Sequence, residues 1–126
     1  MDDPMIRAFA ASLLLTMFAA LPALAVELFM VEQKGCHYCR TWNETIGPIY
    51  PKTAEGAFAP LRRVDLHQGP PEGVAYARRV NFTPTFILID DNKELGRIEG
   101  YPGEDFFWGL LDMMLKAKTS YAGATN

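Results

Sequence analysis

Short apolar segments alternate with amphipathic ones along residues 26–119, and this pattern predicts an α/β domain. Residues 26–31 form a brief, β-prone apolar run typical of a buried strand. Over residues 36–46, apolar side chains recur at helical spacing, which predicts a helix directly after that strand. Residues 61–66 alternate between apolar and polar positions and predict a second strand.

The second half of the domain continues this alternation. Residues 72–80 carry apolar side chains three apart and predict a short amphipathic helix. Residues 85–89 are the most strand-like of the chain, and a turn at residues 90–92 joins them to a strand over residues 94–99. An apolar stripe that follows acidic residues predicts a last helix over residues 104–114. The order β-α-β-α-β-β-α predicts a four-stranded mixed sheet with helices on both faces.

A separate apolar run, residues 8–25, precedes this pattern. It is long enough to be considered as a membrane span, but it ends in Ala23-Leu24-Ala25, the small-x-small sequence that a signal peptidase needs. We therefore expect residues 1–25 to be a cleavable signal peptide that directs the chain to the periplasm. A retained membrane anchor and a buried N-terminal helix are the alternatives. Residues 26–119 then form the domain, and residues 120–126 a flexible polar tail.

Composition narrows the classes of partner. The formal net charge is -3, and basic residues cluster only in the pairs Arg62-Arg63 and Arg78-Arg79, which argues against nucleic-acid binding. No period of 20 to 50 residues recurs, so a repeat protein is excluded. At 126 residues the chain holds one core, and we expect a monomer.

Both cysteines of the chain, Cys36 and Cys39, lie in a C-x-x-C motif on the first turn of the predicted helix. Free backbone N–H groups and the helix dipole stabilise a thiolate there, and in such motifs the pKa of the thiol falls from about 8.5 to between ~3.5 and 7. We expect Cys36 to be the nucleophile and Cys39, on the apolar face, the resolving thiol. The intervening His37 and Tyr38 are expected to tune the pair. A protonated His37 would favour the reduced form, whereas the alternative is that His37 is merely exposed.

Two other uses of the cysteine pair remain open. A structural zinc site takes four Cys or His ligands, and besides the cysteines the chain has only His37 and His67, so we expect no metal site of that kind. A metallochaperone that holds Cu(I) or Zn through the two thiolates is an alternative. A static structural disulfide is another, although so short a loop gains little chain entropy.

The second chemical feature is Phe82-Thr83-Pro84, directly before the strongest predicted strand. A proline at this point cannot donate to the strand ladder, and an X-Pro bond is where a cis peptide is affordable. An ordinary trans proline at a strand edge is the alternative.

Together, the strand VELFMV, the helix-opening CHYC, the TPT before FILID, the hairpin and the last helix resemble the thioredoxin superfamily over residues 26–115. The resemblance implies a thioredoxin-like fold and a thiol:disulfide oxidoreductase that needs no cofactor. It also implies that Pro84 is a cis-proline packed against the cysteines and that the backbone of Thr83 pairs with an extended substrate segment.

One departure from cytosolic-type thioredoxins concerns a buried acid. Met30 stands where those proteins carry an aspartate. Glu32 shares the strand face of Met30 by the period of two, so it is the candidate proton acceptor that activates Cys39. The alternative is that Glu32 is only an exposed acid at the end of a strand.

The segments EQKGCHYCRTW and GYPGEDFFWGLL are similar to small periplasmic thioredoxin-like proteins of bacterial sulfur-oxidation systems, the SoxS-like group. This similarity implies a reductase that acts on a disulfide of a partner protein, such as a sulfur carrier, and receives electrons from a membrane thiol transporter. The alternative is a disulfide-forming or isomerising oxidant, which a charged His37 would favour.

Overall fold

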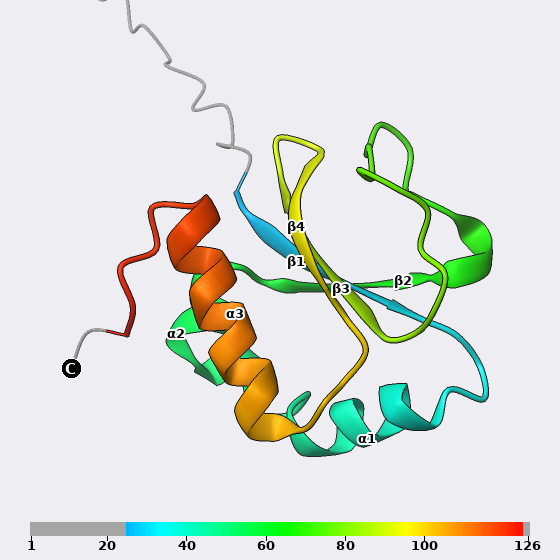
Figure 1. The fold of residues 1–126 in the computed structure, drawn as a ribbon, viewed down its shortest axis with the longest axis horizontal. Helices are drawn as coiled ribbons and strands as arrows, with labels where there is room; N and C mark the ends of the chain where they lie inside the picture. The colour runs from blue at the N-terminus through cyan, green and yellow to red at the C-terminus, as the bar shows by residue number, and fades with distance from the viewer. Residues whose placement is uncertain (1–24, 125–126) are drawn as a thin grey trace, which may run out of the picture.

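The structure, a computed structural model, describes residues 25–124 and contains a four-stranded sheet in the order β2-β1-β3-β4 (Figure 1). β1 (Glu27–Glu32) pairs parallel with β2 (Leu61–Asp65) and antiparallel with β3 (Thr85–Asp90). β4 (Lys93–Glu99) pairs antiparallel with β3 as the outer strand of a hairpin. The expected mixed four-stranded sheet is therefore confirmed.

The three α-helices of the described residues all lie on one face of this sheet (Figure 1). They are α1 (His37–Thr45), α2 (Ala54–Phe58) and α3 (Glu104–Lys118), with the short 3₁₀ helices η2 (Tyr50–Lys52) and η3 (Leu66–Gln68) in the connections. The apolar faces of the helices and the alternate residues of β1 and β3 that point toward them form one core. It includes Leu28 and Met30 of β1, Trp42 of α1, Phe86 and Leu88 of β3, Phe107 and Leu111 of α3, and Ile46.

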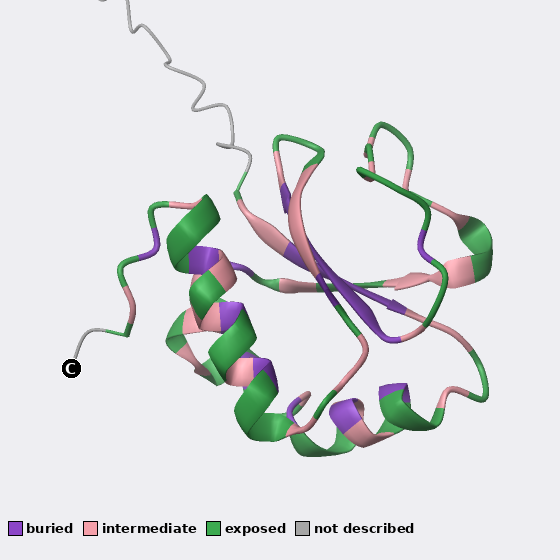
Figure 2. Cartoon of the chain, viewed as in Figure 1, coloured by how far each residue is buried: buried purple, intermediate pink, exposed green. Residues whose placement is uncertain are grey.

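An irregular segment, residues 69–84, covers the second face of the sheet. The predicted helix over residues 72–80 is therefore wrong, and among the described residues the second face carries no α-helix but only the 3₁₀ helix η3, whose Leu66 packs there. Figure 2 shows most of this segment exposed beside the buried centre of the sheet. Val80 is buried and packs with Phe29 and Ile87 in a second, smaller core.

Side chains of β4 explain why this segment is not helical. Arg97 donates hydrogen bonds to the carbonyl oxygens of Arg78 and Arg79, at 2.7 and 3.3 Å. Glu94 accepts a hydrogen bond from the backbone N–H of Ala77. A helix over residues 72–80 would pair the N–H of Ala77 internally, so its hydrogen bond to Glu94 competes with the helix, and the contacts of Arg97 hold the segment in an extended course.

The two ends of the chain differ in what the structure describes. The expected signal peptide, residues 1–25, lies outside the described residues except for its last one. Within residues 25–124, no helix combines the length and the apolar character needed to cross a bilayer. Near the other end, Tyr121 is 7% exposed, and its ring centroid lies 5.2 Å from that of Phe58. The packed structure thus extends past the expected domain boundary at residue 119, because this aromatic ring finds an apolar neighbour.

Candidate active site

The two cysteines lie where β1 gives way to α1. Gly35 has a φ of +76°, a conformation that favours glycine, and it turns the chain into the helix. Cys36 is the N-cap residue, and its sulfur accepts a hydrogen bond from the backbone N–H of Cys39 at 3.1 Å. The two side chains form a disulfide with their Cα atoms 5.2 Å apart. The sulfur of Cys36 therefore lies at the positive end of the α1 dipole, where a thiolate is stabilised once the disulfide is reduced.

The two sulfurs differ in accessibility. Cys36 is partly exposed, whereas Cys39 is only 3% exposed and belongs to the main core. Trp42, one turn further along α1, is fully buried beside it in the same core. This placement is consistent with the expected roles of Cys36 as nucleophile and Cys39 as resolving thiol, because an incoming sulfur can reach Cys36 and not Cys39.

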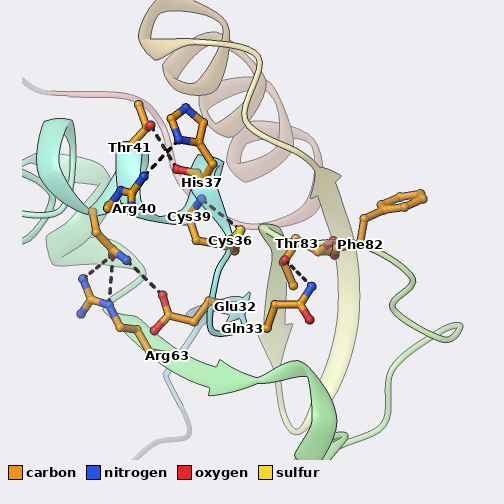
Figure 3. Close-up of a disulfide and its surroundings, with 12 residues drawn as sticks. Glu32, Gln33, Cys36, His37, Cys39, Arg40, Thr41, Arg63, Phe82 and Thr83 are labelled. Atoms are coloured by element: carbon orange, nitrogen blue, oxygen red, sulfur yellow. Dashed lines mark hydrogen bonds between the residues drawn. A yellow bond between two sulfur atoms is a disulfide. The ribbon is translucent and has the colours of Figure 1, made fainter.

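The residues between the cysteines point to solvent. His37 is exposed, and Tyr38 is 60% exposed. Nδ1 of His37 lies 3.3 Å from a guanidinium nitrogen of Arg40 (Figure 3). Arginine has only donors, so Nδ1 of His37 is the acceptor in this contact. The guanidinium of Arg40 brings a permanent positive charge to the hollow that both cysteines line, and the sequence pattern did not single this residue out.

The loop before β3 lies beside the loop that leads to Cys36. Gln33 donates a hydrogen bond to the hydroxyl of Thr83 at 2.9 Å, which links two segments 50 residues apart (Figure 3). The peptide bond between Thr83 and Pro84 is cis. Pro84 is buried, while Phe82 is 54% exposed at the front of the loop. Thr83 precedes β3 and lies outside both of its strand ladders, so its backbone remains available to an extended peptide.

Glu32, the last residue of β1, faces a hollow of about 450 Å³ that both cysteines also line. Its carboxylate accepts a hydrogen bond from the side-chain amide of Asn43 at 3.1 Å. The oxygen of that amide accepts two hydrogen bonds from Arg63, at 3.0 and 3.3 Å. Glu32 is partly exposed and is held at this hollow by its contact with Asn43.

Sequence patterns missed three polar residues of this site: Gln33, Arg40 and Asn43. One signal was available for Asn43, because a residue four positions after Cys39 lies on the same side of a helix. No comparable signal existed for Gln33, whose partner is Thr83, far along the chain.

The candidate site is identified by its cysteine pair and not by the size of its hollow. A larger hollow of about 830 Å³ lies under the irregular segment 69–84 and contains neither cysteine. Among residues 25–124, no three His, Cys, Asp or Glu side chains are placed together to hold a metal ion.

Comparison with solved structures gives two informative matches. The first is the periplasmic thioredoxin SoxS from Paracoccus pantotrophus in its reduced form. It is 48% identical, with a TM-score of 0.71, and the match covers 72% of this chain and 96% of that one. The second is the thioredoxin Mala s 13 from Malassezia sympodialis. It is 17% identical, with a TM-score of 0.52 and coverages of 73% and 76%, and it supports the fold alone. No family model and no curated protein matches the chain.

Proposed function

The chain belongs to the thioredoxin family that contains the periplasmic protein SoxS and is a thiol:disulfide oxidoreductase, and we propose that it reduces disulfides on a partner protein in the periplasm. The observation that carries the proposal is the unequal exposure of the two sulfurs. Cys36 is accessible at a helix N-terminus, whereas Cys39 is 3% exposed behind it. A dithiol built in this way attacks with one sulfur and resolves with the other.

The reaction starts from the reduced protein. The thiolate of Cys36 attacks a disulfide sulfur of the partner, which forms a mixed disulfide and releases the partner's first sulfur as a thiolate. The thiol of Cys39 loses its proton and attacks the sulfur of Cys36. This step forms the Cys36–Cys39 disulfide and releases the second partner thiolate. Two electrons pass to the partner, and a dithiol donor must then reduce Cys36–Cys39 again.

The loop before β3 supplies the substrate platform in this proposal. The backbone of Thr83 pairs with an extended segment of the partner, and Pro84 packs against the cysteine pair. What supports these roles is the hydrogen bond from Gln33 to Thr83, which holds this loop beside the one that leads to Cys36. Glu32 accepts the proton of Cys39. The cation of Arg40 makes the main contribution to tuning the couple, and His37 and Tyr38, on the exposed first turn of α1, make a smaller one.

The similarity to SoxS supports the finer assignments. Because SoxS is described as a periplasmic thioredoxin, we infer export to the periplasm by the residue 1–25 signal peptide. A sulfur carrier protein is the proposed partner, a membrane thiol transporter the proposed electron donor, and the active form a monomer. One observation favours the opposite direction of electron flow. The cation of Arg40 near Cys36 stabilises the thiolate and makes the couple more oxidising.

Two serine variants test the proposal in a protein-disulfide reduction assay with dithiothreitol as electron source. Cys36→Ser is expected to abolish turnover. Cys39→Ser, reduced first and then freed of dithiothreitol before it meets the partner disulfide, is expected to accumulate a mixed disulfide on Cys36, which non-reducing electrophoresis and mass spectrometry detect. Unchanged turnover in Cys36→Ser would overturn the proposal. The potential of the Cys36–Cys39 couple against a glutathione buffer decides the direction, because a value close to the oxidising end near -120 mV would contradict the reductant assignment.

A further inference from the structure

A chain of three polar side chains runs from β2 through α1 to β1 beside the cysteine pair. Arg63 donates from Nε and a terminal guanidinium nitrogen to Oδ1 of Asn43, at 3.3 and 3.0 Å. Nδ2 of Asn43 donates to Oε2 of Glu32 at 3.1 Å. Figure 3 shows Glu32 between Arg63 and the two cysteines. The three side chains come from three elements, so their contacts depend on the tertiary fold.

Arg63 determines which end of the Asn43 amide faces Glu32. A guanidinium can only donate, so it binds the amide oxygen and turns the NH₂ group toward the carboxylate. The amide then occupies one oxygen of Glu32, Oε2, and leaves Oε1 without a side-chain partner among the described residues. Asn43 follows Cys39 by four positions and lies one turn away on the same side of α1. The same hollow is lined by both residues and by Glu32.

We propose that Asn43 is a positioning residue, which holds Glu32 with one carboxylate oxygen directed to receive the proton of Cys39. This inference rests on the proposed function and adds how the proton acceptor is held. In the resolving step, Oε1 of Glu32 takes the proton from the Cys39 thiol as Cys39 attacks the sulfur of Cys36. The S–S bond to the partner breaks, the partner leaves as a thiolate, and Glu32 later releases its proton to water. Without the amide, a carboxylate at the end of a strand has several rotamers, and only some reach Cys39.

Stopped-flow reaction of the reduced protein with an aromatic disulfide such as dithiobis-nitrobenzoate separates the two steps. The first release of coloured thiolate is second order and reports attack by Cys36. The second is independent of reagent concentration and reports attack by Cys39. In Asn43→Asp, a carboxylate replaces the amide, still accepts from Arg63 and repels Glu32. We expect the first phase to stay unchanged and the second to slow about tenfold near pH 6 to 7.

The pH dependence of the second phase distinguishes a loss of positioning from a general disturbance of the structure. At alkaline pH, hydroxide removes the Cys39 proton directly, so the deficit of Asn43→Asp should disappear toward pH 9. Glu32→Gln should show the same profile, and the double variant should be no slower than Glu32→Gln alone, because Asn43 acts only through Glu32. Arg63→Met, which releases the amide without adding charge, should give a smaller deficit of the same form.

Asn92→Asp is the matched control, because it makes the same change of charge in the turn between β3 and β4, away from the cysteines. It should leave both phases unchanged. Additive effects of Asn43→Asp and Glu32→Gln, or a deficit that persists at pH 9, would overturn the role of Asn43. Two intact phases in Cys36→Ser would instead overturn the proposed function, so the two failures are distinguishable.

Discussion

The guanidinium of Arg40 donates a hydrogen bond to Nδ1 of His37, with 3.3 Å between the two nitrogens. The two residues lie three positions apart in α1, next to the cysteine pair. Because the guanidinium stays charged at all accessible pH values, Arg40 keeps a positive charge beside the cysteine hollow at every such pH. This assignment changes which residue is expected to tune the redox couple.

Arg40→Gln is expected to lower the reduction potential of the Cys36–Cys39 couple by about 10 to 30 mV, since a tenfold change in the equilibrium constant is ~30 mV. Loss of the cation destabilises the thiolate and hence the reduced form. His37→Gln should change the potential by less than about 10 mV. Equilibration with glutathione buffers at pH 7 measures both values.

The control for this measurement is Arg62→Gln. The guanidinium of Arg62 lies over the ring of Phe29, 5.2 Å from its centroid and away from the cysteine hollow. Its loss should leave the potential unchanged. An equal shift in His37→Gln and Arg40→Gln would contradict the assignment, because the imidazole would then contribute as much as the guanidinium.

The ion pair between Glu94 and Arg97 should make stability depend on pH. The two side chains are only 3% and 4% exposed. Burial raises the pKa of Glu94, but the hydrogen bonds from Arg97 and from the N–H of Ala77, with the positive charge, outweigh it, so this pKa lies below the ordinary value. A lowered pKa means that the stabilisation is complete above the unfolded-state pKa of about 4.3 and is lost as the pH falls through the folded-state value.

Glu94→Gln is therefore expected to reduce the free energy of unfolding by about 2 kcal/mol at pH 7, because it removes the nearer carboxylate from the buried guanidinium of Arg97 and leaves only Glu99, at 3.7 Å. The difference from the unmodified protein should shrink below about pH 4. Urea unfolding followed by circular dichroism at several pH values measures it. A difference that stays constant down to pH 2 would contradict a role for the charge of Glu94.

Trp42 is the centre of the aromatic cluster beneath Cys39. It is fully buried, with its ring centroid 5.1 Å from that of Phe86 and 5.6 Å from that of Phe107. Trp42→Ala is expected to cost about 3 to 5 kcal/mol of unfolding free energy because it opens a large cavity. Trp42→Phe should cost less, since the indole N–H has no hydrogen-bond partner within residues 25–124. Thermal unfolding that ranks the two variants in the opposite order would contradict this packing.

Two helical glycines should respond oppositely to alanine. A Cβ at Gly56 in α2 would lie 1.8 Å from the carbonyl oxygen of Tyr50, so Gly56→Ala must displace backbone and destabilise the protein. A Cβ at Gly109 in α3 meets no atom within 4 Å. Gly109→Ala should stabilise by about 0.5 to 1 kcal/mol through helix propensity. Melting temperatures of the two variants give the comparison, and a stabilising Gly56→Ala would refute the close approach of α2 to Tyr50.

The strands could be predicted because each has its own local pattern. Residues 85–89 are apolar and β-prone whatever surrounds them, and the structure has β3 from Thr85 to Asp90. The helix over residues 72–80 failed because its pattern rested on only three apolar positions. Arg97 and Glu94, on a later strand, bind the backbone of that segment instead. A local pattern cannot report hydrogen bonds offered from elsewhere in the chain.

The candidate site shows the same division. The C-x-x-C spacing and the helix it opens already point to a redox dithiol, since a thiolate at a helix N-terminus is stabilised by local backbone groups alone. The exposure of Cys36, the burial of Cys39 and the orientation of Glu32 by Asn43 and Arg63 depend on the packing of α1 against β1 and β2. The redox chemistry of the C-x-x-C motif depends on residues that are neighbours in the sequence. The exposure of each sulfur and the orientation of the Glu32 carboxylate depend on groups that only the tertiary fold brings together.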